Sequence, residues 1–289
     1  MKTYDELIDE LNIINETTKM DLSALPHCSN LLYQLQKRDD KNHKFLDSVI
    51  KKYIDIRKIT FSNIDDYVNK IVACVNDYMD MFWPQKNNPY VHQSDFASSV
   101  VPEMLCLIFY EIIKANKSDM EVSAQKNLTI ECIFDFTDGG SVRFKSKRVD
   151  VAVVKNCLLK LDDKEYELPI PLLAIECKTN LDKNMLSGIE FSVGELKKTF
   201  PECNYLVVTE LSDFAVKKLN YASSGINEMY VLRQQKRAEV RRAPYPRNSI
   251  NTDLVKEISY LFEKSLNDIS IESGQLNKKM QEGKLIGRN

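Results

Sequence analysis

The sequence predicts a mixed α/β fold, in which helices pack against a central sheet and a helical region comes first. Apolar residues recur at three- and four-residue steps through the first 85 residues, as they do in amphipathic helices. From residue 128 onward, short apolar runs bounded by turn residues alternate with helical segments. Because the loop WPQKNNP separates these two patterns, we divide the chain into a helical N-terminal region, residues 1–90, and a second domain, residues 91–289.

The helices are predicted from apolar spacing. Apolar residues follow one helix face over residues 64–82, and residues 45–56 repeat the pattern one segment earlier. A third helix is expected over FASSVVPEMLCLIFYEIIKAN, capped by Ser94 or Asp95, with Pro102 at its start or at a kink.

The strands are predicted from apolar runs and turn residues. LTIECIFDF, the turn TDGG and SVRFKSKRVDVAVV form a hairpin. We then expect, in chain order, a strand near CLLKL, a turn at DDKEYELP, a strand at PLLAIECK, a helix over roughly 182–200, a strand at NYLVVTEL, a helix at DFAVKKLNYA, a strand at EMYVLRQQ and a loose tail, KKMQEGKLIGRN.

Composition excludes several classes of protein. Of the 289 residues 43% are hydrophobic, enough for a packed core. The seven cysteines are each 20 or more residues apart and only three histidines are present, which argues against structural zinc and a disulfide framework. Because no run of about 18 apolar residues and no N-terminal signal core occurs, we expect no membrane insertion and a cytoplasmic location. Catalysis would therefore use carboxylates and lysine.

The most informative stretch places Glu176 and Lys178 at the end of an apolar strand. Alternation puts both side chains on one face, and Asp150 lies on the preceding long strand, in reach if the two strands are neighbours. Because burying an ion without a partner is energetically costly, we expect these charged side chains to have partners or a functional role. Two carboxylates and the backbone carbonyl of Cys177 suit Mg²⁺, leaving room for water and phosphate oxygens. Lys178 would orient the water or stabilise developing charge.

Asp150 followed by Glu176-Cys177-Lys178 resembles the PD-(D/E)xK nuclease motif, with Val149 in place of the motif's proline. More narrowly, RVDVAVV, PIPLLAIECKTNLDKNML and EMYVLRQQKR resemble Type II restriction endonucleases of the BbvCI and DdeI kind, over about residues 95–240. The resemblance implies a restriction-endonuclease-like mixed central sheet and Mg²⁺-dependent hydrolysis of double-stranded DNA at a short specific sequence. In relatives of the BbvCI type, two related subunits pair and each cuts one strand.

Three functions remain open after this comparison. The first is a Type II restriction endonuclease or one subunit of it, the second a PD-(D/E)xK repair or junction-resolving nuclease, and the third a non-catalytic DNA-binding module with the same fold. A double-strand break requires two catalytic centres and this chain carries one, so we expect a homodimer or a heterodimer with a related nuclease subunit.

A helix glutamate, Glu103, is a further catalytic candidate, because related nucleases often place a glutamate on the helix before the sheet. There it would reach metal-bound water. The alternative is a solvated helix glutamate, and Glu111 is a competitor on the same helix.

Basic residues point to DNA contacts. Residues 233–247 carry six basic side chains against Glu239 alone, a local net charge of +5, and residues 143–148 add four more positive charges. Arginine and glutamine side chains can read base edges, although a solvated loop is the plain alternative. The expected DNA-binding residues are Lys183, Arg233, Gln234, Gln235, Lys236, Arg237, Arg241 and Arg242. Asn180 or Asp182 is expected to cap the helix that follows the strand, and for Asn180 a capping role is favoured over a functional one.

Overall fold

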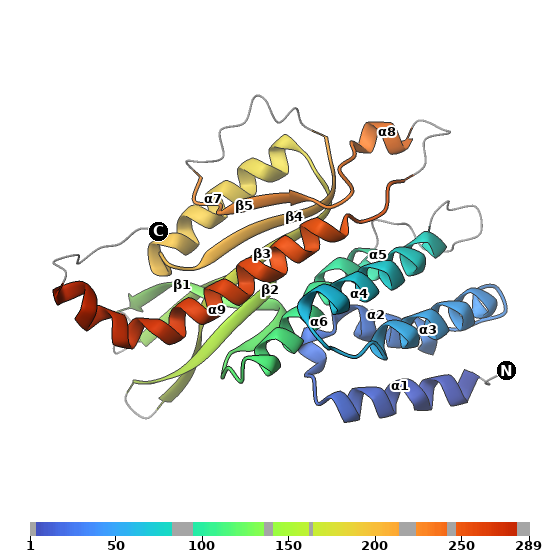
Figure 1. Ribbon diagram of the computed structural model, residues 1–289, viewed down its shortest axis with the longest axis horizontal. Helices are drawn as coiled ribbons and strands as arrows, with labels where there is room; N and C mark the ends of the chain where they lie inside the picture. Colours follow the sequence, from blue (N-terminus) through green and yellow to red (C-terminus); the bar gives the residue numbers. More distant parts are fainter. Residues whose placement is uncertain are drawn as a thin grey trace.

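The computed structural model describes residues 4–82, 95–135, 141–161, 164–213, 224–241 and 247–281. Its centre is a five-stranded sheet in the order β1-β2-β3-β4-β5. The strands are β1 (Glu121–Asp135), β2 (Ser141–Leu161), β3 (Lys164–Leu181), β4 (Asn204–Ser212) and β5 (Glu228–Val231). The first three pair antiparallel and the last two join in parallel, which gives the expected mixed sheet (Figure 1).

The β2–β3 hairpin is longer than predicted. CLLKL is the end of β2 rather than a separate strand, and most of DDKEYELP lies in β3 rather than in a turn. The reason is pairing, since the register runs without interruption from Cys157↔Leu168 to Leu161↔Lys164. Ladder hydrogen bonds along this arm outweigh the polar composition that predicted a turn.

Helices form the N-terminal region, as expected. They are α1 (Tyr4–Thr18), η1 (Leu22–Ala24), α2 (Pro26–Gln36), α3 (His43–Arg57), α4 (Ile64–Met79) and η2 (Asp80–Phe82), followed by α5 (Asp95–Ser98) and α6 (Val100–Ala115). Asn63 caps α4 by accepting a hydrogen bond from the Asp66 amide at 2.9 Å. Pro102 falls in the first turn of α6, where its missing N–H breaks no helical hydrogen bond.

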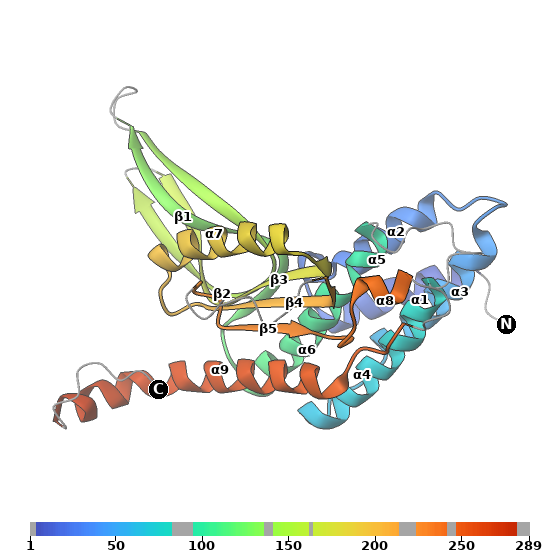
Figure 2. The same cartoon turned by 90° about the horizontal axis from the view of Figure 1, so that it is seen from above.

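Two helical layers cover the sheet (Figure 2). On one face α7 (Lys183–Thr199) buries Leu186, Val193 and other apolar residues against the strands. On the other face α6 and α9 (Thr252–Gln281) share one continuous core with the N-terminal helices. This core contains residues from both sides of residue 90. The division of the chain into two domains at that point therefore stays a prediction.

Segment 95–115 is long and apolar enough to cross a membrane by length and composition, but most of it is buried inside the protein. It is the central core helix of this fold. In the described part of the chain no other helix passes that test.

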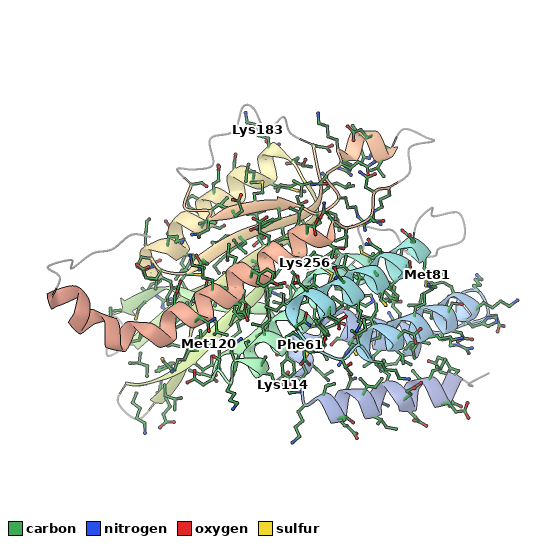
Figure 3. The ribbon with its side chains drawn as sticks, viewed as in Figure 1. Phe61, Met81, Lys114, Met120, Lys183 and Lys256 are labelled. Atoms are coloured by element: carbon green, nitrogen blue, oxygen red, sulfur yellow. The ribbon has the colours of Figure 1, made fainter. Side chains whose placement is uncertain are left out.

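Helix α9 was not predicted. Val255, Ile258 and Phe262 are fully buried at helical spacing, a pattern that the sequence carries and that would have revealed the helix. Lys256, labelled in Figure 3, lies on the same helix and pairs with Asp65 of α4 at 3.6 Å. The tail expected to be loose begins at residue 278, but its first four residues, KKMQ, are the end of α9, which corrects that expectation. The helix predicted at DFAVKKLNYA, apart from its first residue, and residues 282–289 lie outside the described residues.

Candidate active site

The β2–β3 ladder places Asp150 and Glu176 side by side. Val151 pairs with Ile175, so the next step along the antiparallel ladder sets Asp150 against Glu176. Residues opposite each other in a ladder project from the same face, and Lys178 joins them two residues later.

The three side chains converge around the Lys178 ammonium. Its Nζ lies 2.8 Å from Glu176 Oε1 and 3.6 Å from Asp150 Oδ2. The Cys177 amide donates to Asp150 Oδ2 at 2.7 Å, and Gln125 Nε2 donates to Asp150 Oδ1 at 3.0 Å. The structure therefore brings the three residues predicted from the sequence into one charged cluster.

Burial sets the electrostatics of this cluster. Loss of water raises the pKa of Asp150 and the Glu176 carboxylate raises it further, although Lys178 opposes both effects. Burial alone would lower the pKa of Lys178, but the two carboxylates outweigh it and the net shift is upward. Lys178 is therefore an ammonium at neutral pH, and it acts as a hydrogen-bond donor and a positive charge rather than as a base.

Glu176 is the more buried of the two carboxylates, with 8% of its surface exposed. Tyr205 donates to its Oε2 at 3.3 Å, and Lys147 Nζ lies 3.8 Å from the same oxygen. The contact with Glu176 and burial together raise the pKa of Tyr205, which keeps its hydroxyl protonated as a donor.

A cavity of about 620 Å³ opens beside the cluster. Asp150 and Lys178 line it, whereas Glu176 lies behind Lys178 and does not. Helices α2, α5 and α6 contribute the opposite wall, and strands β1, β2 and β4 complete it with Gln125, Arg148 and Glu210. The cluster thus faces a space large enough for a ligand group to reach Asp150 and Lys178.

The donor set fits a hard divalent cation. Asp150, Glu176 and the carbonyl oxygen of Cys177 are the oxygen ligands that Mg²⁺ takes, with water and phosphate completing its shell. Within the described residues no group of three or more His, Cys, Asp and Glu side chains could hold a metal ion, so a cation here would depend on these three donors. The ammonium of Lys178 pairs with both carboxylates and offsets part of their negative charge.

Comparison with known proteins decides the family. The profile described as Bpu10I restriction endonuclease matches residues 93–266, more than half of the chain. The chain belongs to the Bpu10I restriction endonuclease family. A solved chain titled "native BbvCI A2B2 tetramer at low resolution" is similar over 85% of this chain and 96% of its own, with 24% sequence identity and a TM-score of 0.69. That similarity shows the fold, and a comparison with curated sequences gave no match.

These findings confirm two expectations. The mixed sheet with flanking helices is the restriction-endonuclease-like fold that was predicted, and the function is that of a Type II restriction endonuclease or a subunit of one. The match includes Asp150, Glu176 and Lys178, and leaves out the whole N-terminal helical region, residues 1–90.

The endonuclease fold does not bring Glu103 to the cluster. Its carboxylate accepts hydrogen bonds from the Tyr53 hydroxyl at 2.5 Å and the Cys28 amide at 2.8 Å, which ties α6 to α2 and α3. The solvated alternative is wrong, since Glu103 is 2% exposed. Neither Glu103 nor Glu111 lines the cavity.

Two expected DNA-binding residues of the endonuclease are buried instead. Arg233 is 2% exposed and donates to Glu210 Oε2 at 2.8 Å, and Arg247 contacts the same oxygen. Gln235 is also buried, where its side chain accepts from the Asn248 amide at 3.0 Å. Arg233 and Gln235 therefore hold the backbone near the end of β4, a correction to the expectation that they touch DNA.

The remaining predicted DNA contacts stay at the surface. Gln234, Lys236 and Arg241 are exposed, and Arg237 is half-buried with Asp213 at 3.9 Å. Arg237 and Arg241 lie on α8 (Arg237–Arg241). Arg242 lies outside the described residues.

Asp182 rather than Asn180 caps α7, because its side chain accepts from the Met185 amide at 2.9 Å. Asn180 still belongs to β3 and is buried. Lys183 begins α7 and is exposed, and Figure 3 shows it far from the N-terminal helices.

Two residues at the centre, Gln125 and Tyr205, escaped prediction. Lys147 and Arg148 were expected only as part of the basic run 143–148, and the structure places them beside Glu176 and in the cavity wall, respectively. Arg148 precedes Asp150 by two residues, so strand alternation offered a signal for it. Tyr205 and Gln125 carry no such signal, because their positions depend on long-range pairing.

Proposed function

We propose that the chain, acting in the cytoplasm, hydrolyses phosphodiester bonds of double-stranded DNA at a short specific sequence, with Mg²⁺ held by Asp150, Glu176 and the Cys177 carbonyl. The observation that carries the proposal is the convergence of two carboxylates and one ammonium beside an open cavity. When bound, the ion polarises the phosphate and lowers the pKa of a bound water.

The residues of the chain divide the remaining work. Asp150 is fixed through both carboxylate oxygens, so its orientation is set before any ligand arrives. Lys178 lines the cavity and presents its ammonium to the attacking water or to a phosphate oxygen, where it stabilises negative charge. Glu176, buried behind it, holds Lys178 in place.

Exposed cations supply the grip on DNA. Lys236, Arg237 and Arg241 flank the sheet end that carries the cluster, and Lys183 stands at the start of α7. Such side chains bind phosphates, while Gln234 is suited to a base edge. For the N-terminal helical region the two proposed roles are DNA recognition and dimerisation, and the place of helix α2 in the cavity wall supports DNA recognition.

The assembly contains at least two such centres. Each chain contributes one cluster, and the similar BbvCI structure is titled an A2B2 tetramer. We therefore propose a homodimer, or a heterodimer with a related subunit in which each chain cuts one strand.

Cleavage of supercoiled plasmid tests the proposal. Purified protein with Mg²⁺ is expected to give discrete fragments, or site-specific nicks if a second subunit cuts the other strand, and EDTA is expected to stop the reaction. Asp150→Ala is expected to abolish cutting while sequence-specific DNA binding survives, because it removes transition-state stabilisation rather than grip. Cutting directed by branched DNA would instead indicate a repair nuclease. No cutting by the wild-type chain, alone or with a related subunit, would reject the catalytic role.

A further inference from the structure

Gln125 interrupts β1 directly across from Asp150. Ala124 pairs with Val151 and Lys126 pairs with Val149, so the register sets Gln125 opposite Asp150. Its backbone φ is 54°, in the left-handed region that strains every residue with a Cβ atom.

Near Gln125 and Asp150, the buried side chains of β1 and β2 switch from one hydrophobic core to the other. Ala124 packs in the core with α6, whereas Leu128, an even number of residues later, packs in the core with α7. Val149 and Val151 are likewise divided between the two cores, although residues two apart normally share a face. The left-handed conformation therefore marks a twist in the ladder, with Gln125 and Asp150 at its pivot.

The twist aims the Gln125 amide at the carboxylate. Gln125 Nε2 donates to Asp150 Oδ1 at 3.0 Å, while the Cys177 amide donates to Oδ2 at 2.7 Å. Each oxygen thus has one protein donor, which fixes the plane of the carboxylate. Gln125 also lines the cavity beside Asp150.

We propose that Gln125 is a positioning residue of the catalytic centre: it is held in a left-handed conformation so that its amide orients Asp150 toward the divalent cation. The inference depends on the proposed function, because it assigns a partner to the expected metal ligand. Groups that orient metal ligands typically change metal affinity or activity about 10- to 100-fold when removed.

The variant Gln125→Gly distinguishes the effect of the side-chain amide from the effect of the left-handed backbone. Glycine adopts a positive φ without strain, so the variant keeps the twist and loses only the amide. We expect an unchanged or higher melting temperature, together with a dissociation constant for Mn²⁺ that rises about tenfold. Binding of Mn²⁺ to the protein alone is followed by electron paramagnetic resonance. In cleavage assays kcat is expected to fall about 10- to 100-fold, with KM for DNA unchanged.

Asn127→Gly is the matched control. Asn127 is exposed two residues further along β1, so this variant measures the effect of a glycine in the same strand. It is expected to keep the Mn²⁺ affinity and kcat of the wild type.

The outcomes separate this inference from the proposed function. Wild-type Mn²⁺ affinity and kcat in Gln125→Gly would overturn the inference while cleavage by the wild type still supports the nuclease. Equal losses in both glycine variants would also overturn it, because the strand rather than the amide would be responsible. If the wild type cuts no DNA, the proposed function fails, and the Mn²⁺ titration alone decides the role of Gln125.

Discussion

Single residues carry opposite roles according to what surrounds them. Lys178 lies near the end of β3 and Arg233 follows β5, yet Lys178 lines an open cavity and Arg233 is enclosed. Arg233 donates to Glu210, and its guanidinium also contacts the carbonyl oxygen of Asn248. A buried cation with these partners is a structural element, because DNA could reach it only after the ion pair broke.

Replacing Arg233 should therefore destabilise the protein. We expect Arg233→Ala to lower the free energy of unfolding by about 3–5 kcal/mol, since it breaks a buried ion pair and leaves Glu210 with Arg247 alone of its two arginines. Urea unfolding followed by circular dichroism measures the change. Arg241→Ala, at an exposed site, serves as the control and should change the unfolding free energy by less than about 0.5 kcal/mol. A stable Arg233→Ala variant with weakened DNA binding would restore the base-reading role predicted from the sequence.

At the scale of elements, a buried polar network joins the N-terminal helices to α6. His27 of α2 is 1% exposed, with Nδ1 2.8 Å from the Phe96 carbonyl oxygen and Nε2 2.6 Å from the Tyr78 hydroxyl. A neutral ring satisfies both contacts when Nδ1 donates and Nε2 accepts. Burial lowers the pKa of His27 to about 3.

This shift predicts acid sensitivity. Between its ordinary pKa of 6.5 and about 3, the unfolded chain binds a proton that the folded chain refuses, so stability falls as pH falls through this window. From pH 7 to pH 5 the loss should reach about 2 kcal/mol.

Comparing the pH dependence of unfolding in wild type and His27→Gln isolates this effect. Burial raises the pKa of the neighbouring Glu103, which acts in the opposite direction, but that contribution is shared by both proteins. The variant is expected to have the shallower slope. If the free energy of unfolding depended on pH equally in wild type and His27→Gln, His27 would take up its proton as readily in the folded as in the unfolded chain, and the prediction would be wrong.

Elements were predictable where their signal is local. The alternation of Glu176 and Lys178 and the apolar run before them defined β3 and the face of the cluster. The length of the β2–β3 arm depends on pairing between Cys157 and Leu168, which composition does not reveal. Because arginine is rarely buried, the segment rich in Arg and Gln after β5 was predicted to be exposed. In the structure Arg233 is buried instead, because it pairs with Glu210 of β4. Gln125 could not be assigned, because its left-handed backbone arises only when β1 meets β2.

At the scale of the whole molecule, the described part of the chain presents one such cluster, on β2 and β3. A concerted break in both DNA strands therefore needs a second chain. Sedimentation at concentrations that cut DNA is expected to show an assembly, either of this chain alone or with a related subunit. Concerted double-strand cleavage by a sedimenting monomer would contradict this expectation.

DNA binding by the assembly should depend strongly on salt. Each phosphate neutralised by a lysine or arginine contributes about −0.9 to the slope of log K against log salt. Arg241→Ala is expected to reduce that slope by about 1 if Arg241 meets a phosphate. Titration of labelled DNA at several salt concentrations measures it, and an unchanged slope would remove Arg241 from the interface.

If Asp150, Glu176 and Lys178 form the catalytic centre, the cleavage rate of Lys178→Ala in Mg²⁺, measured beside its DNA affinity, will show it. We expect unchanged DNA affinity and folding, with cleavage lost by at least about 100-fold, because the ammonium stabilises charge that develops only in the transition state. Cleavage by Lys178→Ala at the wild-type rate would contradict this assignment.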